Sequence, residues 1–193
     1  MKKWSQDLTT KLQSDRHAQF SEGLEQLGNI LGYSASRPKH GAATDCRWRG
    51  VHGNIKELIT FEAKIEDTPS GEIIASDVGQ AHNQMNRAKR EYEPLGYLVR
   101  GTIVTHLTSI THDAEASAGI LKVVEKSAVL ELWSRIRTLL SLYRDGWSLE
   151  NLSARLAATE TIRPRLPRAG WLVRVLDGED RTVTAGQLLA EWS

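Results

Sequence analysis

The pattern of apolar and polar positions divides the chain into helical and extended segments. In residues 4–32 apolar side chains recur every three or four positions, which is typical of a helix with one buried face, and Gly32 is expected to end that helix. Residues 57–66 instead alternate, which predicts a strand with one apolar face and one mixed face. The apolar run at residues 97–108 predicts a second, central strand.

A short alternating segment, residues 44–50, precedes the strand at 57–66. The dipeptide Gly53-Asn54 lies between them and favours a tight turn, so the two strands are expected to pair as an antiparallel hairpin. Residues 33–43 and 67–72 have the composition of loops.

Helices are predicted on either side of the central strand. The first spans about residues 76–96, with Ser76 as the candidate N-cap and Pro94 with Gly96 at its end. The second spans residues 117–146. Helix, strand, strand, helix, strand, helix is therefore the expected order, which is an α/β fold with a mixed sheet flanked by helices.

The C-terminal part of the sequence is expected to form a separate extension. A short helix is expected at residues 147–159, capped by Ser148, followed by a hairpin through Asp177-Gly178 and a closing short helix. We therefore expect a core at residues 1–146 and a helix–hairpin–helix extension at residues 147–193. This extension would cap the core, mediate self-association or dock onto a partner.

Composition excludes several classes of protein. The chain of 193 residues has 40% apolar residues and one cysteine, so no intramolecular disulfide and no cysteine-based zinc cluster can form. It has no apolar run long enough to span a membrane, and its start lacks the apolar region of a secretory signal. A cytoplasmic setting is expected.

A formal net charge of +1 neither requires nor excludes nucleic acid as a partner. Binding to DNA would need basic residues gathered on one face of the protein. The predicted helix at residues 76–96 offers such a group in Arg87, Lys89 and Arg90.

The candidate chemistry lies on the predicted strand at residues 57–66. Glu62 and Lys64 fall on the same face, and Asp45 stands at the head of the strand that is expected to pair with it. Asp45 and Glu62 can therefore converge, and two carboxylates with a backbone carbonyl are ligands that Mg²⁺ accepts. Lys64 would lie beside them, where an ammonium group can stabilise developing phosphorane charge.

These residues resemble the motif of the PD-(D/E)xK nuclease superfamily, which has the restriction-endonuclease-like fold. Asp45 in "AATDCRW" and Glu62 with Lys64 in "FEAK" match, although Thr44 replaces the usual proline before the aspartate. The resemblance spans about residues 18–110 and implies a further acidic residue on the first helix. Glu22 stands at that place, and Glu25, one turn on, is the rival.

The combination of "ATDCRW", "FEAK" and, on the following helix, "DVGQA" resembles nuclease domains that are fused to, or encoded beside, helicases and other bacterial defence ATPases. Gln80 matches the glutamine that many members of the superfamily place beside the active site. Gln84 lies one turn on, on the same face. The resemblance thus implies an antiviral-defence or DNA-processing assembly with a helicase or ATPase partner, and a homodimer is a further expectation.

The resulting prediction is an Mg²⁺-dependent nuclease that hydrolyses phosphodiester bonds, with DNA as the expected substrate and Mn²⁺ able to substitute. Asp45, Glu62 and the carbonyl of Ala63 would hold the metal, with help from Glu22, while Lys64 and Gln80 would position water and phosphate. Gln84, Arg87, Lys89 and Arg90 would contact nucleic acid. Two alternatives stay open, a non-catalytic module that binds nucleic acid or a partner through the same fold, and a ribonuclease.

Overall fold

A computed structural model describes residues 2–38, 44–65, 71–107, 109–149, 151–168 and 170–190. Parts of the two predicted loops, at 39–43 and 67–70, residue 66 at the end of the predicted strand, and the last three residues of the predicted closing helix lie outside the described residues. The α-helices are α1 (Lys2–Gln13), α2 (His17–Ile30), α3 (Ala75–Tyr92), α4 (His112–Ala118), α5 (Lys126–Trp147), α6 (Leu152–Ile162), α7 (Trp171–Asp177) and α8 (Ala185–Ala190). The strands are β1 (Ser34–Ser36), β2 (Cys46–His52), β3 (Ile55–Lys64), β4 (Glu72–Ile73), β5 (Leu98–Thr105), β6 (Ser109–Ile110), β7 (Lys122–Glu125) and β8 (Thr182–Val183). Two short 3₁₀ turns, η1 (Glu93–Leu95) and η2 (Arg163–Arg165), follow α3 and α6.

A six-stranded mixed sheet forms the centre of the molecule, with the strand order β1-β2-β3-β5-β7-β8. The pairs β1–β2 and β2–β3 are antiparallel, whereas β3–β5, β5–β7 and β7–β8 are parallel. Strands β4 and β6 make a separate parallel pair. This architecture confirms the predicted α/β class with a mixed sheet flanked by helices.

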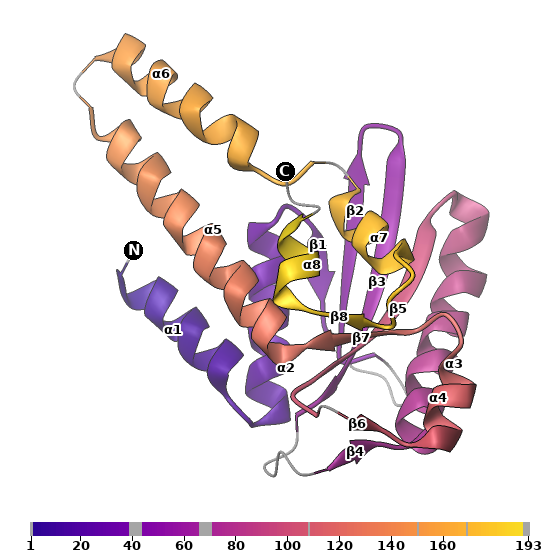
Figure 1. The fold of residues 1–193 in the computed structure, drawn as a ribbon. Coiled ribbons are helices and arrows are strands. Elements are labelled where there is room, and N and C mark those ends of the chain that lie inside the picture. The colour runs from indigo at the N-terminus through magenta and orange to yellow at the C-terminus, as the bar shows by residue number, and fades with distance from the viewer. Residues whose placement is uncertain are drawn as a thin grey trace.

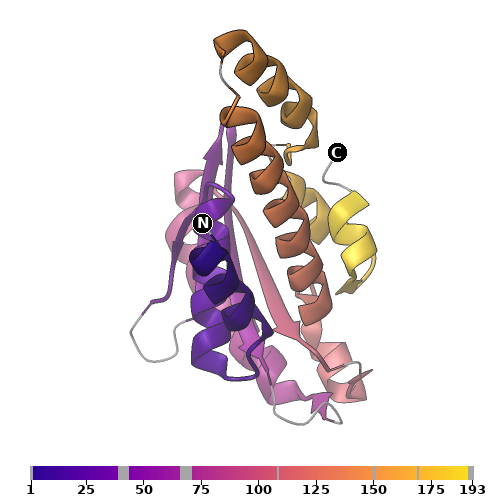
Figure 2. The ribbon, with the colours of Figure 1, turned by 90° about the vertical axis from the view of Figure 1, so that its left-hand side faces the viewer.

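Helices cover both faces of the sheet (Figures 1 and 2). Helices α2, α5, α7 and α8 pack on one face through one large hydrophobic cluster, and α1 packs against α2 and α5. Helices α3 and α4 pack on the other face through a second cluster. At Gly28 on α2, an added Cβ would lie 2.4 Å from Nε1 of Trp48, so only glycine lets this helix approach β2 so closely.

The predicted β2–β3 hairpin is confirmed. His52 pairs with Ile55, and the turn passes through Gly53, whose φ of +62° lies in the left-handed region that favours glycine. Side chains alternate along β3 as expected, because Ile59 and Phe61 enter the cluster under α2 whereas Leu58 enters the cluster under α3.

Helix α3 ends as predicted but begins differently. Gly96, with φ of +83°, follows the 3₁₀ turn that contains Pro94. Ser76, however, is not the N-cap, because Ile74 occupies that position and its N–H donates to a carboxylate oxygen of Asp77 at 3.3 Å. An acidic residue three positions into the helix performs the capping here, and it also satisfies the positive end of the helix dipole.

The single helix predicted over residues 117–146 is wrong. Helix α4 ends at Ala118, and residues 122–125 form β7 before α5 begins at Lys126. Periodicity cannot show whether an apolar run as short as "LKVV" forms a strand or part of a helix. Pairing with β5 and β8 on its two sides decides in favour of a strand.

The next predicted helix start is also wrong. Ser148 lies at the C-cap of α5 rather than at an N-cap, and α5 passes through Gly146 to Trp147. Helix α6 is capped instead by Asn151, whose side-chain oxygen accepts a hydrogen bond from the N–H of Ala154 at 2.7 Å.

The hairpin predicted through Asp177-Gly178 is wrong as well. Its first half is helix α7, whose buried side chains include Trp171 and Leu172, and its second half is β8, which pairs in parallel with β7. The run "WLVRVL" is buried on most sides, so its apolar pattern fits a strand as well as a helix. The closing helix α8 is confirmed.

The segment 147–193 thus contributes a strand to the central sheet and side chains to its larger cluster. The functional boundary at residue 146 stays a prediction. Helices α5 and α6 extend away from the sheet as an antiparallel arm (Figure 1). No helix within the described ranges combines the length and the apolar character needed to cross a bilayer.

Candidate functional site

The site at the C-terminal end of β3 begins with Asp45, which immediately precedes β2. The pairing Cys46↔Phe61 continues by one step to place Asp45 opposite Glu62, on the same face of the sheet. Oδ2 of Asp45 accepts a hydrogen bond from the N–H of Ala63 at 2.7 Å and lies 2.9 Å from Nε2 of His17. The predicted convergence of Asp45 with β3 is therefore present in the structure.

Glu62 is buried, with 2% of its surface exposed. Oε2 accepts a hydrogen bond from Nε2 of Gln84 at 2.8 Å, and Oε1 lies 3.2 Å from Nζ of Lys64. Burial raises the pKa of this carboxyl, and the negative charge of Asp45 raises it further, against the opposing effects of Gln84 and Lys64. The charge of Asp45 therefore acts on Glu62 at this edge of the sheet.

Lys64 links the strand to helix α3. Its Nζ lies 3.1 Å from Oδ1 of Asp77 and donates to Oε1 of Gln80 at 3.4 Å. Burial lowers the pKa of the ammonium group, but the hydrogen bond to Asp77 and the charges of Glu62 and Asp77 outweigh that effect and raise it. Lys64 is therefore held as a cation between the two helical side chains and Glu62, and Gln80 is in contact with it.

His17 and Asp77 belong to this cluster, and sequence reasoning missed both. His17 is the first residue of α2, and its hydrogen bond to Asp45 raises the pKa of the imidazole, with burial acting in the opposite direction. No spacing in the sequence relates position 17 to position 45. Asp77 could have been found, because it lies three residues before Gln80 on the helix that was expected to flank the site.

Glu22 does not join the cluster through any interaction among the described residues. Its Oε1 lies 2.9 Å from Nζ of Lys11 and accepts a hydrogen bond from Gln26 at 3.3 Å. The rival, Glu25, is paired with Arg37 at 2.7 Å. The role of Glu22 at a metal stays a prediction.

Gln84 was predicted to contact nucleic acid, but it is buried and holds Glu62. Arg87 and Arg90 are exposed, and Lys89 is half-buried. Because a helix rises by about 1.5 Å per residue, Arg90 lies about 15 Å along α3 from Gln80. The contact of Arg87, Lys89 and Arg90 with nucleic acid stays a prediction.

The donor atoms of this cluster determine whether it can bind a divalent cation. Within the described ranges, no group of three or more histidine, cysteine, aspartate or glutamate side chains is arranged to hold a metal ion. The neighbouring carboxylates of Asp45 and Glu62, with the carbonyl of Ala63, nevertheless supply the hard oxygen donors that Mg²⁺ and Mn²⁺ bind. A cation between the two carboxylates would offset the repulsion that raises the pKa of Glu62. The residues therefore fit such an ion, with water completing its coordination.

Comparisons with known proteins add one finding on the fold. No protein-family model matches the chain, and no curated protein matches it. Among solved structures, the restriction endonuclease FokI aligns with a TM-score of 0.44 and 11% identity. The alignment covers 68% of this chain and 27% of the FokI chain, so it spans less than a third of that protein. The likeness concerns the coarse arrangement of the fold.

Proposed function

We propose that this protein is a divalent-metal-dependent nuclease that hydrolyses phosphodiester bonds in DNA. The main support is the buried carboxylate of Glu62, which faces Asp45 across a strand pair and Lys64 along its own strand. Burying an ionised group is costly unless neighbouring charges compensate it. A protein gains little stability from placing two acids at one buried edge, so a role in chemistry accounts for them better.

Asp45, Glu62 and the carbonyl of Ala63 are the proposed ligands of Mg²⁺, with Mn²⁺ as a substitute and Glu22 contributing through water. The ion would neutralise charge on the phosphate and lower the pKa of a bound water. The N–H of Ala63 and the amide of Gln84 hold one oxygen of each carboxylate, and so fix the orientation of Asp45 and Glu62.

Lys64 and Gln80 would orient the attacking water and the scissile phosphate. Asp77 and Glu62 keep the ammonium group of Lys64 charged and in place. Its third N–H, which donates to Gln80 at 3.4 Å, would turn to a phosphate oxygen when the substrate binds. His17, 2.9 Å from Asp45, brings a second nitrogen donor to the same edge. Positioning and charge stabilisation are the two contributions that phosphodiester hydrolysis requires of protein side chains.

The setting is proposed as well. A near-neutral chain does not bind polyanions indiscriminately, so DNA would be held locally, with Arg87, Lys89 and Arg90 as candidate backbone contacts. We place the protein in the cytoplasm, in a bacterial defence or DNA-processing assembly with a helicase or ATPase partner. A homodimer is a further possibility that the test below can include.

Cleavage assays test the proposal. The protein is incubated with single-stranded, duplex and branched DNA and with RNA, in Mg²⁺, Mn²⁺ or EDTA. Metal-dependent cleavage is expected, lost in Asp45→Asn, Glu62→Gln and Lys64→Met and retained in Asp113→Asn, an exposed carboxylate on α4. Size-exclusion chromatography with light scattering gives the oligomeric state of the same samples.

One observation favours a second candidate, a non-catalytic binding module. Asp45 and Glu62 already have nitrogen partners in His17, Gln84 and Lys64, and the described residues supply no third acidic ligand. Retained DNA binding without cleavage of any substrate in either metal would support this module. Cleavage confined to RNA would support the ribonuclease.

A further inference from the structure

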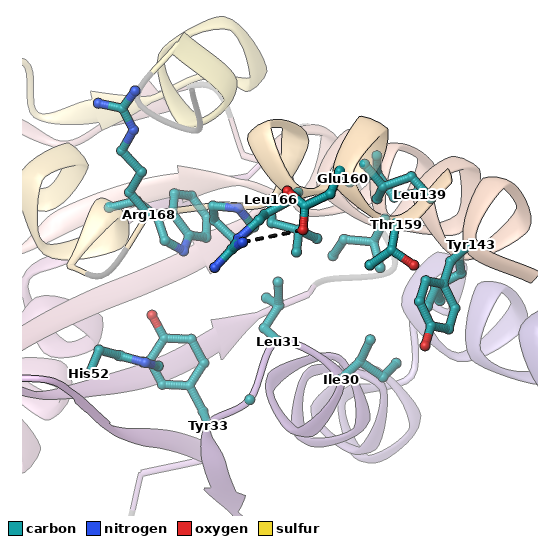
Figure 3. A pocket seen from close by; sticks show the side chains of 17 residues that line it. Ile30, Leu31, Tyr33, His52, Leu139, Tyr143, Thr159, Glu160, Leu166 and Arg168 are labelled. Atoms are coloured by element: carbon teal, nitrogen blue, oxygen red, sulfur yellow. Dashed lines mark hydrogen bonds and ion pairs between the residues drawn. The ribbon is translucent and has the colours of Figure 1, made fainter. Parts of the chain in front are cut away.

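A cavity of about 620 Å³ lies between the base of the α5–α6 arm and the C-terminal end of α2. Its walls are mainly apolar. Figure 3 shows Ile30 and Leu31 on one side and Leu139, Tyr143 and Leu166 on the other. This volume falls within the range of about 300–1,000 Å³ that is usual for small-molecule sites.

One end of the cavity is polar because of a buried group behind its wall. Tyr33 and His52 line the cavity, and both contact Oε1 of Glu57, at 2.7 Å from the tyrosine oxygen and 3.4 Å from Nε2 of the histidine. Glu57 is fully buried, and its Oε2 has no hydrogen-bond partner among the described residues. Gly50 makes this packing possible, because an added Cβ would lie 2.7 Å from the His52 ring.

The mouth of the cavity carries more positive than negative charge. Arg163, Arg168 and one acidic residue, Glu160, are among the residues that line it. Arg163 Nη1 lies 3.3 Å from Glu160, which is the dashed contact in Figure 3. Both members of this pair are largely exposed, so their attraction is weak and an incoming anion can compete for the guanidinium group.

This cavity is separate from the proposed nuclease site. Glu57 and Glu62 lie five residues apart on β3, so their side chains point to opposite faces of the sheet. The cavity lies beside the start of β3 on the α2–α5 face, whereas Lys64 lies at the end of β3 and contacts α3. Occupation of the cavity can therefore be tested without any assumption about catalysis.

We infer that this cavity is a binding site for a small amphiphilic anion, a molecule with an apolar body and one anionic group. The apolar walls would take the body out of water, which is the main source of affinity in such sites. Arg163 would pair with the anionic group at the mouth, in place of Glu160. Tyr33 and His52 would close the inner end.

Two fluorescent probes of the same shape test this inference. 1-Anilinonaphthalene-8-sulfonate has an aromatic body and a sulfonate, and N-phenyl-1-naphthylamine has the same body without the charge. Titration of the intact protein is expected to show one saturable site for the sulfonate probe. Thr159→Trp, which adds a large side chain from the α6 wall, should weaken both probes by at least about tenfold, because the body no longer fits.

Charge recognition is tested by Arg163→Gln. This substitution should weaken the sulfonate probe by about fivefold and leave the uncharged probe unchanged, since an exposed charge pair contributes modestly. Arg87→Gln, on the far side of the sheet, is the matched control and should change neither. Leu31→Trp fills the cavity from α2 and replaces Thr159→Trp if that variant has an altered melting temperature.

Three results would overturn the inference. The first is the absence of saturable binding by either probe. The second is unchanged probe affinity in Thr159→Trp and Leu31→Trp together with loss of binding in Leu152→Gln, a variant at an exposed leucine of the arm. That combination would show that the probes bind the surface of the arm rather than the cavity. The third is an equal effect of Arg163→Gln on both probes, which would exclude recognition of the anion.

Discussion

Two buried carboxylates on one strand, Glu57 and Glu62, have very different surroundings. Glu57 lies among a tyrosine, a histidine and apolar side chains, and one of its oxygens has no partner in the described structure. Glu62 has nitrogen donors at both oxygens and a second acid beside it. Burial alone therefore does not distinguish these two carboxylates, whereas the type of neighbouring side chain does.

The difference follows from the alternation of β3. Position 57 points to the face covered by α2 and α5, and position 62 to the face covered by α3. The α3 face supplies Asp77, Gln80 and Gln84 at consecutive helical turns, so polar groups converge on the end of the strand. The α2 face supplies Tyr33 and apolar groups, so it isolates its carboxylate instead.

The largest expected effect separates the two acids by activity. If the proposed function holds, Glu62→Gln and Asp45→Asn should each reduce cleavage by at least about 100-fold, because each removes a charged ligand. Glu57→Gln should leave the rate per folded molecule within about twofold. Initial rates at saturating Mg²⁺ measure this, and equal losses in Glu57→Gln and Glu62→Gln would remove the distinction between the two acids.

The next largest expected effect concerns the surroundings of Glu57 and is measured as the free energy of unfolding. Tyr33→Phe removes the hydroxyl that donates to Glu57 at 2.7 Å, and should lower the free energy of unfolding by about 1–3 kcal/mol because a buried acceptor loses its donor. The double variant Tyr33→Phe with Glu57→Gln should recover part of that loss, since a neutral amide is less costly to bury. Urea unfolding followed by circular dichroism gives both values. Strict additivity of the two substitutions would show that these side chains are not coupled.

A smaller effect depends on pH. The folded state raises the pKa of Glu62 above the ordinary 4.5, so the folded protein binds this proton more tightly than the unfolded chain does. Its contribution to stability is therefore lost as pH rises from about 4.5 through the raised value. Glu62→Gln has no such group, so its melting temperature relative to wild type should increase between pH 4 and pH 8. A constant difference across that range would contradict the raised pKa.

The smallest expected effect tests whether Cys46 and its neighbour Asp45 point to opposite faces of the sheet. Cys46, next to Asp45, points into the core, and burial raises the pKa of its thiol to about 12. It should therefore resist a thiol reagent at pH 8 in the native state and react fully in urea. Rapid native labelling, with the melting temperature unchanged, would place Cys46 on the exposed face and would reverse the assignment of faces for Asp45.

The sequence by itself determined the local parts of this protein. Alternation of apolar residues and the Gly53-Asn54 turn were sufficient for the β2–β3 hairpin, because both signals act over a few residues. That hairpin in turn places Asp45 opposite Glu62. Helix α3 and its end at Gly96 were likewise predictable from helical periodicity and a glycine stop, and with them the approach of Gln80 to Lys64.

Only the tertiary structure decided the rest. The segments at β7 and α7 are short and largely apolar, so their conformation depends on the strands and helices that they pack against. The parallel pairing of β8 with β7 likewise forms only in the assembled sheet. His17 contacts Asp45, and Tyr33 contacts Glu57, at sequence separations of 28 and 24 positions. Such contacts leave no period in the sequence, because they form when α2 packs onto the sheet, and that packing is set by burial across the whole core.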